Sequence, residues 1–274
     1  MKALKLAGLF VVVLAVFIGV FLLIPNGENS KLPPVSANLY ETYRQQITSE
    51  WEQAGDWQES LFKQNHDLVQ QLSTKYTGEK IDALRQLNSR SAIEVVKKKV
   101  FEEWASPTCK KATVDQYVRG VNTIIKTDPA VKSDNDVKQI LDVNNTYVAA
   151  YNLAHKGVGL KPSFNGDSWQ SYDSYAQSLK KQKADIMHRS NYTQYLSNIT
   201  DIKNGLNAID SKLKQGRTTY YKSLASAIID YFRNVERNTE NLNKLRSARN
   251  RYENEYQANS NLTEFTREFA QNII

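Results

Sequence analysis

Cysteine is nearly absent from this sequence: Cys109 is the only one among 274 residues. An intrachain disulfide is therefore excluded, and a cysteine-based zinc site would lack its other ligands. Two interpretations of this thiol stay open. It is either a small half-buried side chain or the site of a disulfide between two chains in an oxidising compartment, which would make the protein a homo-oligomer.

The patterns that mark catalytic and metal sites are also missing. The three histidines, His66, His155 and His188, lie far apart, and none has a partner at the spacing used by zinc proteases. Gly157 and Gly159 follow no strand and lack the third glycine of a nucleotide-binding loop, and there is no Gly-x-Ser-x-Gly motif. We therefore predict no metal, no cofactor and no enzymatic activity.

Dense positive charge interleaved with aromatic residues, the pattern of nucleic-acid binding, does not occur either. The formal net charge is +7, and residues from 36 onward carry 33 basic and 28 acidic side chains. The densest basic run, residues 97–99, is typical of a solvated helix face, with an anionic partner or lipid surface as the alternative. We expect no nucleic-acid partner.

One long apolar segment is present, residues 6–24, and it contains no charged side chain. As a helix it would be roughly 28 Å long, close to the hydrocarbon thickness of a bilayer. It is longer than the roughly 7–15-residue core of a secretory signal, and the first good cleavage pattern, residues 35–37, lies well beyond it. The segment predicts a retained transmembrane anchor. A cleaved signal is the main alternative and a buried helix of a soluble protein a lesser one.

The flanks of the apolar segment predict its orientation. Lys2 and Lys5 precede it, so residues 1–5 should be cytoplasmic and the bulk of the chain extracytoplasmic, which we take to be a bacterial periplasm. Small residues recur along one face every four positions, and among them Ala7, Ala15 and Gly19 are candidates for packing against a second transmembrane helix. The alternative is that alanine and glycine are simply common in such segments.

Beyond the apolar segment the sequence is helical in pattern. Residues 25–37 form a linker stiffened by Pro33 and Pro34. From Ser36 onward apolar residues follow a helical period, and no alternating pattern lasts more than four positions, so we predict an all-α, elongated helical bundle. We expect a bundle over 38–157, a loop over 158–168, a long antiparallel coiled-coil hairpin over 169–260 and a short helix over 261–274.

The hairpin carries the residues that we predict to contact a partner. Apolar positions from His188 to Tyr256 step by three and four, which is typical of coiled-coil packing, and residues 215–217 interrupt them. A turn there would place Arg217, Tyr220, Tyr221 and Lys222 at an exposed tip. Core packing is the alternative for the two tyrosines.

Two polar residues, Asn238 and Arg249, fall on the apolar stripe of the second arm of this hairpin. An asparagine in a coiled-coil seam often fixes the register of the two helices. The alternative is that the bundle opens there and both residues face a cavity or a partner.

These observations favour a protein that acts by contact. Our leading prediction is a single-pass, membrane-anchored extracytoplasmic scaffold or accessory subunit of an envelope complex, with membrane or envelope proteins as partners. The alternative is a sensor or ligand-binding module in which the loop over 156–168 and the bundle interior form a pocket and a membrane partner relays the signal. An enzyme ranks third, because no catalytic constellation is evident.

Overall fold

The computed structural model describes residues 32–257, 261–271 and 273. This part of the chain is helical, which confirms the predicted all-α class. A single bridge between Pro34 and Thr77 is the only pairing of extended backbone within it. None of the helices described is both long and apolar enough to cross a bilayer. The apolar segment 6–24, with Ala7, Ala15 and Gly19, lies outside the described residues.

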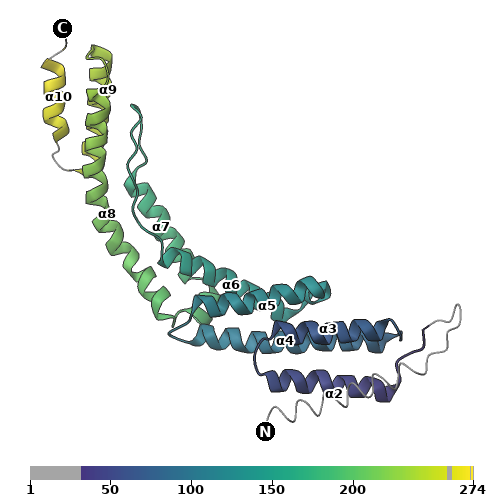
Figure 1. Ribbon diagram of the computed structural model, residues 1–274. Helices are drawn as coiled ribbons and strands as arrows, with labels where there is room; N and C mark the ends of the chain where they lie inside the picture. The colour runs from purple at the N-terminus through teal and green to yellow at the C-terminus, as the bar shows by residue number, and fades with distance from the viewer. Residues whose placement is uncertain (1–31, 258–260, 272, 274) are drawn as a thin grey trace.

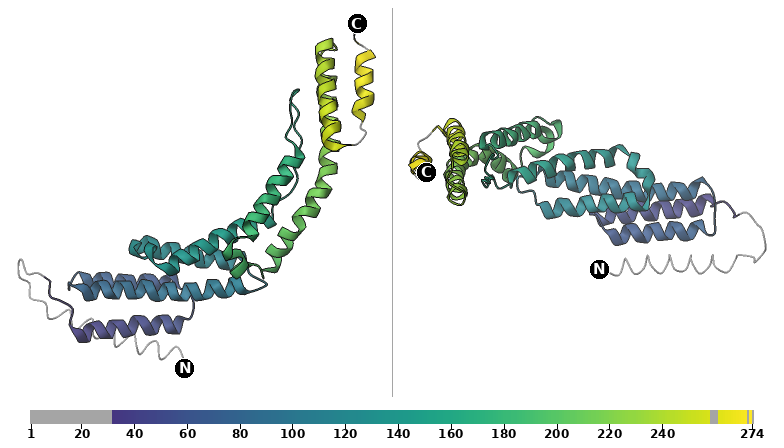
Figure 2. Two further views of the ribbon diagram at one scale, coloured as in Figure 1. Left: turned by 180° about the vertical axis from the view of Figure 1, so that it is seen from behind. Right: turned by 90° about the horizontal axis from the view of Figure 1, so that it is seen from above.

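The helices form two arms that meet at an elbow, and the bend is visible from the front and from behind (Figures 1 and 2). The first arm contains α2 (Ala37–Ala54), α3 (Glu59–Ser73), α4 (Glu79–Ala105), α5 (Lys111–Thr127), a short 3-10 helix (Pro129–Ser133) and α6 (Asn135–Ala154). The second contains α7 (Tyr172–Met187), α8 (Thr200–Arg233), α9 (Thr239–Tyr256) and α10 (Asn261–Gln271). The central helix of the first arm is α4, which α2, α3, α5 and α6 contact, and that of the second is α8, which α6, α7, α9 and α10 contact.

The first arm has an apolar core that includes large aromatic side chains. Trp51, Phe62 and Trp104 are buried there. The indole Nε1 of Trp51 donates to Asn88 Oδ1 at 2.9 Å, and Asn88 Nδ2 donates to the carbonyl of Phe62 at 3.1 Å. A buried amide without partners would cost free energy, so this chain of hydrogen bonds favours one alignment of α2, α3 and α4.

The described chain enters the first arm at the end farthest from the elbow (Figure 1). Thr77 N donates to the carbonyl of Pro33 at 3.0 Å, Val35 is buried, and Lys80 Nζ lies 3.5 Å from the carbonyl of Val35. From residue 33 onward, the segment that we predicted as a linker is therefore held against the connection between α3 and α4.

The elbow is built by close contacts between α6 and the start of α8. A Cβ at Gly205 would lie 2.6 Å from the Cβ and 2.7 Å from the carbonyl oxygen of Ala154, so only glycine fits. His155 Nε2 lies 2.9 Å from Asp201 Oδ2 in an adjacent contact. Both central helices, α4 and α8, thus contact α6 at the elbow.

A turn of π-helix, Tyr192–Leu196, completes the elbow. The hydroxyl of Tyr195 accepts a hydrogen bond from Gln139 Nε2 at 3.0 Å, and its ring meets the edge of Phe101 at 4.9 Å between centroids. Thr200 N, at the start of α8, donates to the carbonyl of Pro107 at 3.0 Å. Side chains and backbone from α4, α6 and α8 therefore fix this corner.

The predicted turn at residues 215–217 is wrong, because α8 is continuous through them. Gly216 does not form a turn. It lets Tyr172 pack closely against α8, because a Cβ at this position would lie 2.5 Å from the Tyr172 hydroxyl oxygen. The hairpin between α8 and α9 turns instead at residues 234–238, and its second helix begins after Asn238.

The connection over residues 155–171 extends beside α8 and returns to the start of α7 (Figure 1). Its Phe164 ring packs on Tyr231 and Phe232, with centroids 5.3 Å and 5.9 Å away. Gly166 has a φ of +101°, and a Cβ there would lie 2.4 Å from the Tyr231 hydroxyl oxygen. The loop therefore packs against the core along the second arm.

Candidate functional site

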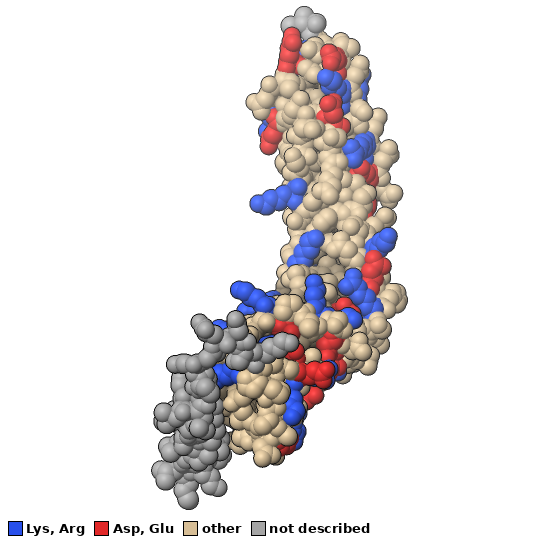
Figure 3. All heavy atoms as spheres, turned by 90° about the vertical axis from the view of Figure 1, so that its right-hand side faces the viewer, with Lys and Arg blue, Asp and Glu red and all other residues tan. Residues whose placement is uncertain are grey.

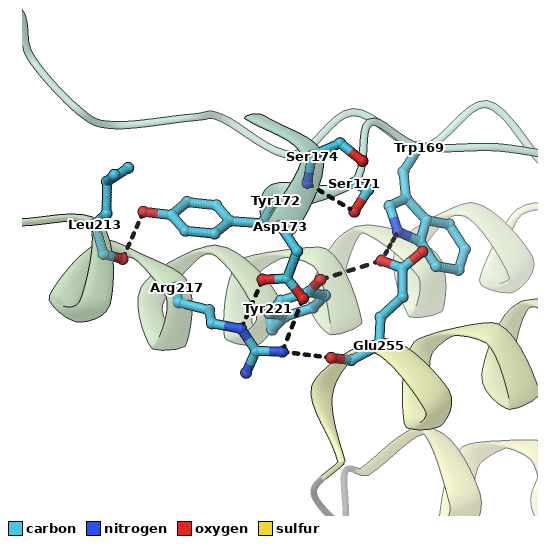
Figure 4. Close-up of polar contacts among 9 residues, drawn as sticks. All are labelled: Trp169, Ser171, Tyr172, Asp173, Ser174, Leu213, Arg217, Tyr221 and Glu255. Atoms are coloured by element: carbon cyan, nitrogen blue, oxygen red, sulfur yellow. Dashed lines mark hydrogen bonds and ion pairs between the residues drawn. The ribbon is translucent and has the colours of Figure 1, made fainter. Parts of the chain in front are cut away.

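Three of the four residues predicted at an exposed tip lie in a junction between α7, α8 and α9, and Figure 4 shows two of them, Arg217 and Tyr221. Tyr220 and Tyr221 are buried in α8, and Arg217 is half-buried beside them, whereas Lys222 is exposed. We call this region the tyrosine junction and define it by Trp169, Tyr172, Asp173, Arg217, Tyr220, Tyr221, Arg251, Tyr252 and Glu255.

Arg217 links all three helices. Its Nε donates to Asp173 Oδ1 at 2.9 Å and its Nη2 to Asp173 Oδ2 at 3.2 Å, a two-pronged ion pair with the start of α7. Nη2 also donates to the carbonyl of Glu255 near the end of α9. The guanidinium lies over the Tyr221 ring, 5.0 Å from its centroid. The hydrogen bonds to Asp173 raise the pKa of Arg217, so it remains charged.

Glu255 collects donors from three segments. Its Oε2 accepts from Trp169 Nε1 at 3.0 Å and from the Tyr221 hydroxyl at 3.1 Å, while Oε1 accepts from Arg251 Nε at 3.0 Å. Arg251 also covers the Trp169 ring at 3.9 Å and donates to its carbonyl at 3.1 Å. Hydrogen bonds to charged groups are about twice as strong as neutral ones, so this carboxylate fixes the loop to both helices.

The junction tyrosines act as neutral hydrogen-bond donors. Tyr172 donates to the carbonyl of Leu213 at 2.8 Å, Tyr252 to that of Tyr221 at 3.1 Å, and Tyr220 to that of Gln170. Burial raises the pKa of Tyr220 and of Tyr252 to about 12, and burial together with the Glu255 carboxylate raises that of Tyr221 further. Their protons are therefore not available for chemistry near neutral pH.

The polar groups of the junction bind one another and the backbone, and so hold the surrounding segments together. Its two arginines and two carboxylates are already paired with each other, with phenols or with backbone carbonyls, and its phenols point at backbone or carboxylate oxygens. Ion pairs combined with cation–π contacts hold segments from four places in the sequence together. These groups therefore have a structural role: they set how α7, α8, α9 and the loop lie against each other.

A second feature is a groove between the ends of α6 and α7, with a cavity volume of about 370 Å³. Asn152 and Lys156 line its α6 side, and Gln182, Asp185 and Arg189 line its α7 side. The apolar floor includes Leu153 and Ile186, both buried. Its charged rim offers two cations and one carboxylate, a set suited to an anionic group. Sequence reasoning did not find this groove, because its two walls are about 30 residues apart.

The two polar residues predicted in a seam have other roles. Asn238 lies before α9 as its N-cap, and its Oδ1 accepts from Asn241 N at 2.9 Å. Arg249 Nη2 donates to Asn250 at 3.0 Å, and its Nε lies 3.7 Å from Glu253 Oε1. These contacts lie within one helix. The seam prediction fails for Asn238 because the true turn falls just before it.

The remaining candidates stay apart in space. No cluster of three or more potential metal ligands occurs in the described part of the chain. His66 stacks on Phe62 at 6.5 Å, and His155 faces Asp201. Cys109 is half-buried with its sulfur 3.9 Å from the Tyr147 hydroxyl, and burial raises its pKa to about 11.

Sequence reasoning missed the six residues that complete the junction: Trp169, Tyr172, Asp173, Arg251, Tyr252 and Glu255. Arg251 and Glu255 stand four residues apart on one helix, the spacing of an ion pair, but that signal is common on helices. Their loop partner Trp169 lies more than 80 residues away, and Asp173 in α7 lies 44 residues from its partner Arg217, so neither contact has a local signal.

Searches of protein-family models, of curated proteins and of solved structures found nothing that matches this chain.

Proposed function

We propose that this protein is a single-pass, membrane-anchored extracytoplasmic scaffold or accessory subunit of an envelope complex, acting by protein–protein contact. The observation that carries the proposal is where the chain enters the fold. Residues 33–35 are held at the end of the first arm that is remote from the elbow. Only seven residues separate the apolar segment, which ends at Ile24, from Leu32, and the eight Cα-to-Cα steps between these two residues span at most about 28 Å.

An anchor over residues 6–24 would therefore keep the far end of the first arm close to the membrane. The 27 residues of α4 make that arm about 40 Å long, so the elbow stands off by that length along the arm. Lys2 and Lys5 support a cytoplasmic start and an extracytoplasmic bulk. An arm of this kind has the geometry to hold a partner at a set distance and in a set direction from the membrane anchor.

The fixed bend adds support for a spacing role. Gly205 and Ala154 leave no gap at the elbow, and the tyrosine junction joins the loop to α7, α8 and α9. A scaffold transmits position only if its joints resist bending, and these joints combine close packing with charge-assisted hydrogen bonds. The groove between α6 and α7 favours the ligand-binding alternative.

The test is purification of the full-length chain from its native membranes in a mild neutral detergent. We expect it to elute in a stoichiometric complex with membrane or envelope proteins, and to be digested by protease only from the extracytoplasmic side. A clean monomer would rule out the scaffold, and digestion from the cytoplasmic side would rule out the orientation. A thermal shift with a small molecule, together with a monomeric state, would favour the sensor instead.

Self-association through the anchor is a separable part of the proposal. If the small-residue face that contains Ala7, Ala15 and Gly19 packs against a second membrane helix, Gly19→Leu should shrink the complex on native gels. Phe17→Leu, on the opposite side of the same helix, is the matched control. An unchanged complex in both variants would show that this face plays no part.

A further inference from the structure

Positive charge is concentrated in one stretch of the second arm. Residues 156–222, which include the returning loop, α7 and the first two-thirds of α8, contain eleven Lys and Arg against five Asp and Glu, a net charge of +6. Residues 223–271 contain seven of each, and residues 32–154 contain fifteen basic and sixteen acidic side chains. The excess charge of the described chain therefore lies in this stretch, which we call the basic segment.

The basic side chains of this segment are mostly left without a partner. Within the described residues, only Lys183 and Arg217 form ion pairs, with Asp210 and Asp173. The other nine are exposed and form none there. Figure 3 shows several Lys and Arg side chains standing out singly from the lower half of the upright arm. Unneutralised charge of one sign raises the local potential and attracts a partner of opposite charge.

The distribution of these charges fits a flexible partner better than a flat surface. Lys203 and Lys214 are eleven residues apart and share one side of α8, whereas Lys212 projects from nearly the opposite side. A bilayer would meet only one side at a time. The large apolar side chains exposed in the described chain are only Leu32, Met187 and Tyr231, so little is available to insert into lipid.

The groove between α6 and α7 offers such a partner a defined binding site for one of its side chains. Two cations of the basic segment line it, Lys156 on the α6 side and Arg189 on the α7 side, together with the amides of Asn152 and Gln182 and one carboxylate, Asp185. A carboxylate entering the groove would meet donors from both walls and would be partly shielded from water, which strengthens charge-assisted hydrogen bonds.

We propose that the basic segment is the docking surface for a strongly acidic polypeptide segment, one of whose carboxylates enters this groove. The inference rests on the proposed scaffold function, because it names the chemistry of the partner that the second arm presents. An acidic chain can follow cations around the arm, and the groove sets where it starts. Binding of this kind should weaken steeply with salt.

The test measures binding of fluorescently labelled polyglutamate to the full-length chain in neutral detergent, by anisotropy at several salt concentrations. The main variant replaces Lys180, Lys181, Lys203, Lys212 and Lys214 with glutamine. The matched control replaces five exposed lysines of the first arm with glutamine and changes the net charge equally: Lys98, Lys110, Lys126, Lys132 and Lys138. We expect about a tenfold or larger loss of affinity in the main variant and less than twofold in the control. The double variant Lys156→Ala and Arg189→Ala should lose about three- to tenfold.

Equal losses in the two lysine variants, or no binding at low salt, would overturn the docking surface. A membrane is the competing occupant. To test for membrane binding, a fluorescent dye is attached to a cysteine introduced by Ser211→Cys in a chain that also carries Cys109→Ser. Energy transfer from this dye to labelled lipid is then measured in nanodiscs. Transfer that rises when anionic lipid replaces zwitterionic lipid, without polyglutamate binding, would also overturn the proposal. In each case a native complex of normal composition would leave the scaffold function standing, so the two failures are distinguishable.

Discussion

Both arms of this molecule have an apolar core, but the polar contacts that supplement it differ. The first relies on packed apolar side chains and one short chain of buried amide hydrogen bonds around Trp51 and Asn88. The second adds to its apolar core the tyrosines, arginines and carboxylates that meet in the tyrosine junction, and it carries the excess positive charge. The comparison suggests a division of roles: the first arm is a post of nearly neutral surface, and the second is assembled from distant segments and presents charge.

The largest expected effect is in the first arm. Trp51→Ala should lower the free energy of unfolding by about 3–5 kcal/mol, because it opens a cavity in the core and removes the donor to Asn88. Trp51→Phe keeps most of the ring and leaves Asn88 short of one partner, at a cost of about 1–3 kcal/mol. Urea unfolding of the full-length chain measures both. Equal losses would mean that the hydrogen bond, and not packing, dominates this core.

The elbow comes next. Gly205→Ala should destabilise the fold by about 1–3 kcal/mol, although alanine is the better helix former, because its Cβ would overlap Ala154. Gly159→Ala is the control, since nothing lies within 4 Å of the added atom. A more stable Gly205→Ala variant would show that α6 and α8 separate easily, and the fixed bend would be in doubt.

The tyrosine junction should be sensitive to loss of charge. Glu255→Gln keeps the shape of the side chain but weakens three charge-assisted contacts, so we expect a loss of about 1–3 kcal/mol. Glu240→Gln removes an ion pair with Lys244 that water screens on the exposed surface, so its cost should be clearly smaller. Chemical denaturation measures both losses. If the two are alike, the junction adds no more than a surface pair.

The smallest effect is expected in alkali. The pKa values of Tyr220 and Tyr252 are raised on folding to about 12, from about 10 in the unfolded chain. An acid whose pKa is raised by folding contributes stability below its unfolded pKa and loses it as the pH rises through the folded value. The urea midpoint should therefore hold up to about pH 9 and fall between pH 10 and 12. Tyr252→Phe should fall less steeply over that range, and a parallel curve would contradict this assignment.

The helices were predictable because their signals are local. Gly55 ends α2 with a φ of +59°, a conformation that favours glycine, so a single residue marks the end of this helix. The short C-terminal helix has a strong one-sided apolar pattern, which reappears as the buried residues Leu262, Phe265 and Phe269. Such features depend on neighbours within one or two turns of helix.

The junction was not predictable because it depends on contacts distant in sequence. Glycine is common in turns, yet Gly216 lies in the middle of α8. It is there because the ring of Tyr172, which is 44 residues away in the sequence, packs against it. The three–four apolar spacing continues through the true turn at 234–238, so it concealed the role of Asn238 as a helix cap. A regular apolar spacing shows which side of a helix is buried, but it does not show which other segment packs against that side.

The central claim is that the two arms are held at one angle. Its most direct test is a pulsed EPR distance between spin labels at Gln71→Cys, toward the far end of the first arm, and Asn243→Cys on α9. Both positions are exposed, and the protein is the full-length chain in nanodiscs with Cys109→Ser. A pair within the first arm, Gln71→Cys and Lys98→Cys, supplies the reference width. We predict a single distance distribution about as narrow as that reference; a distribution several times broader would contradict a fixed elbow and, with it, the spacing role.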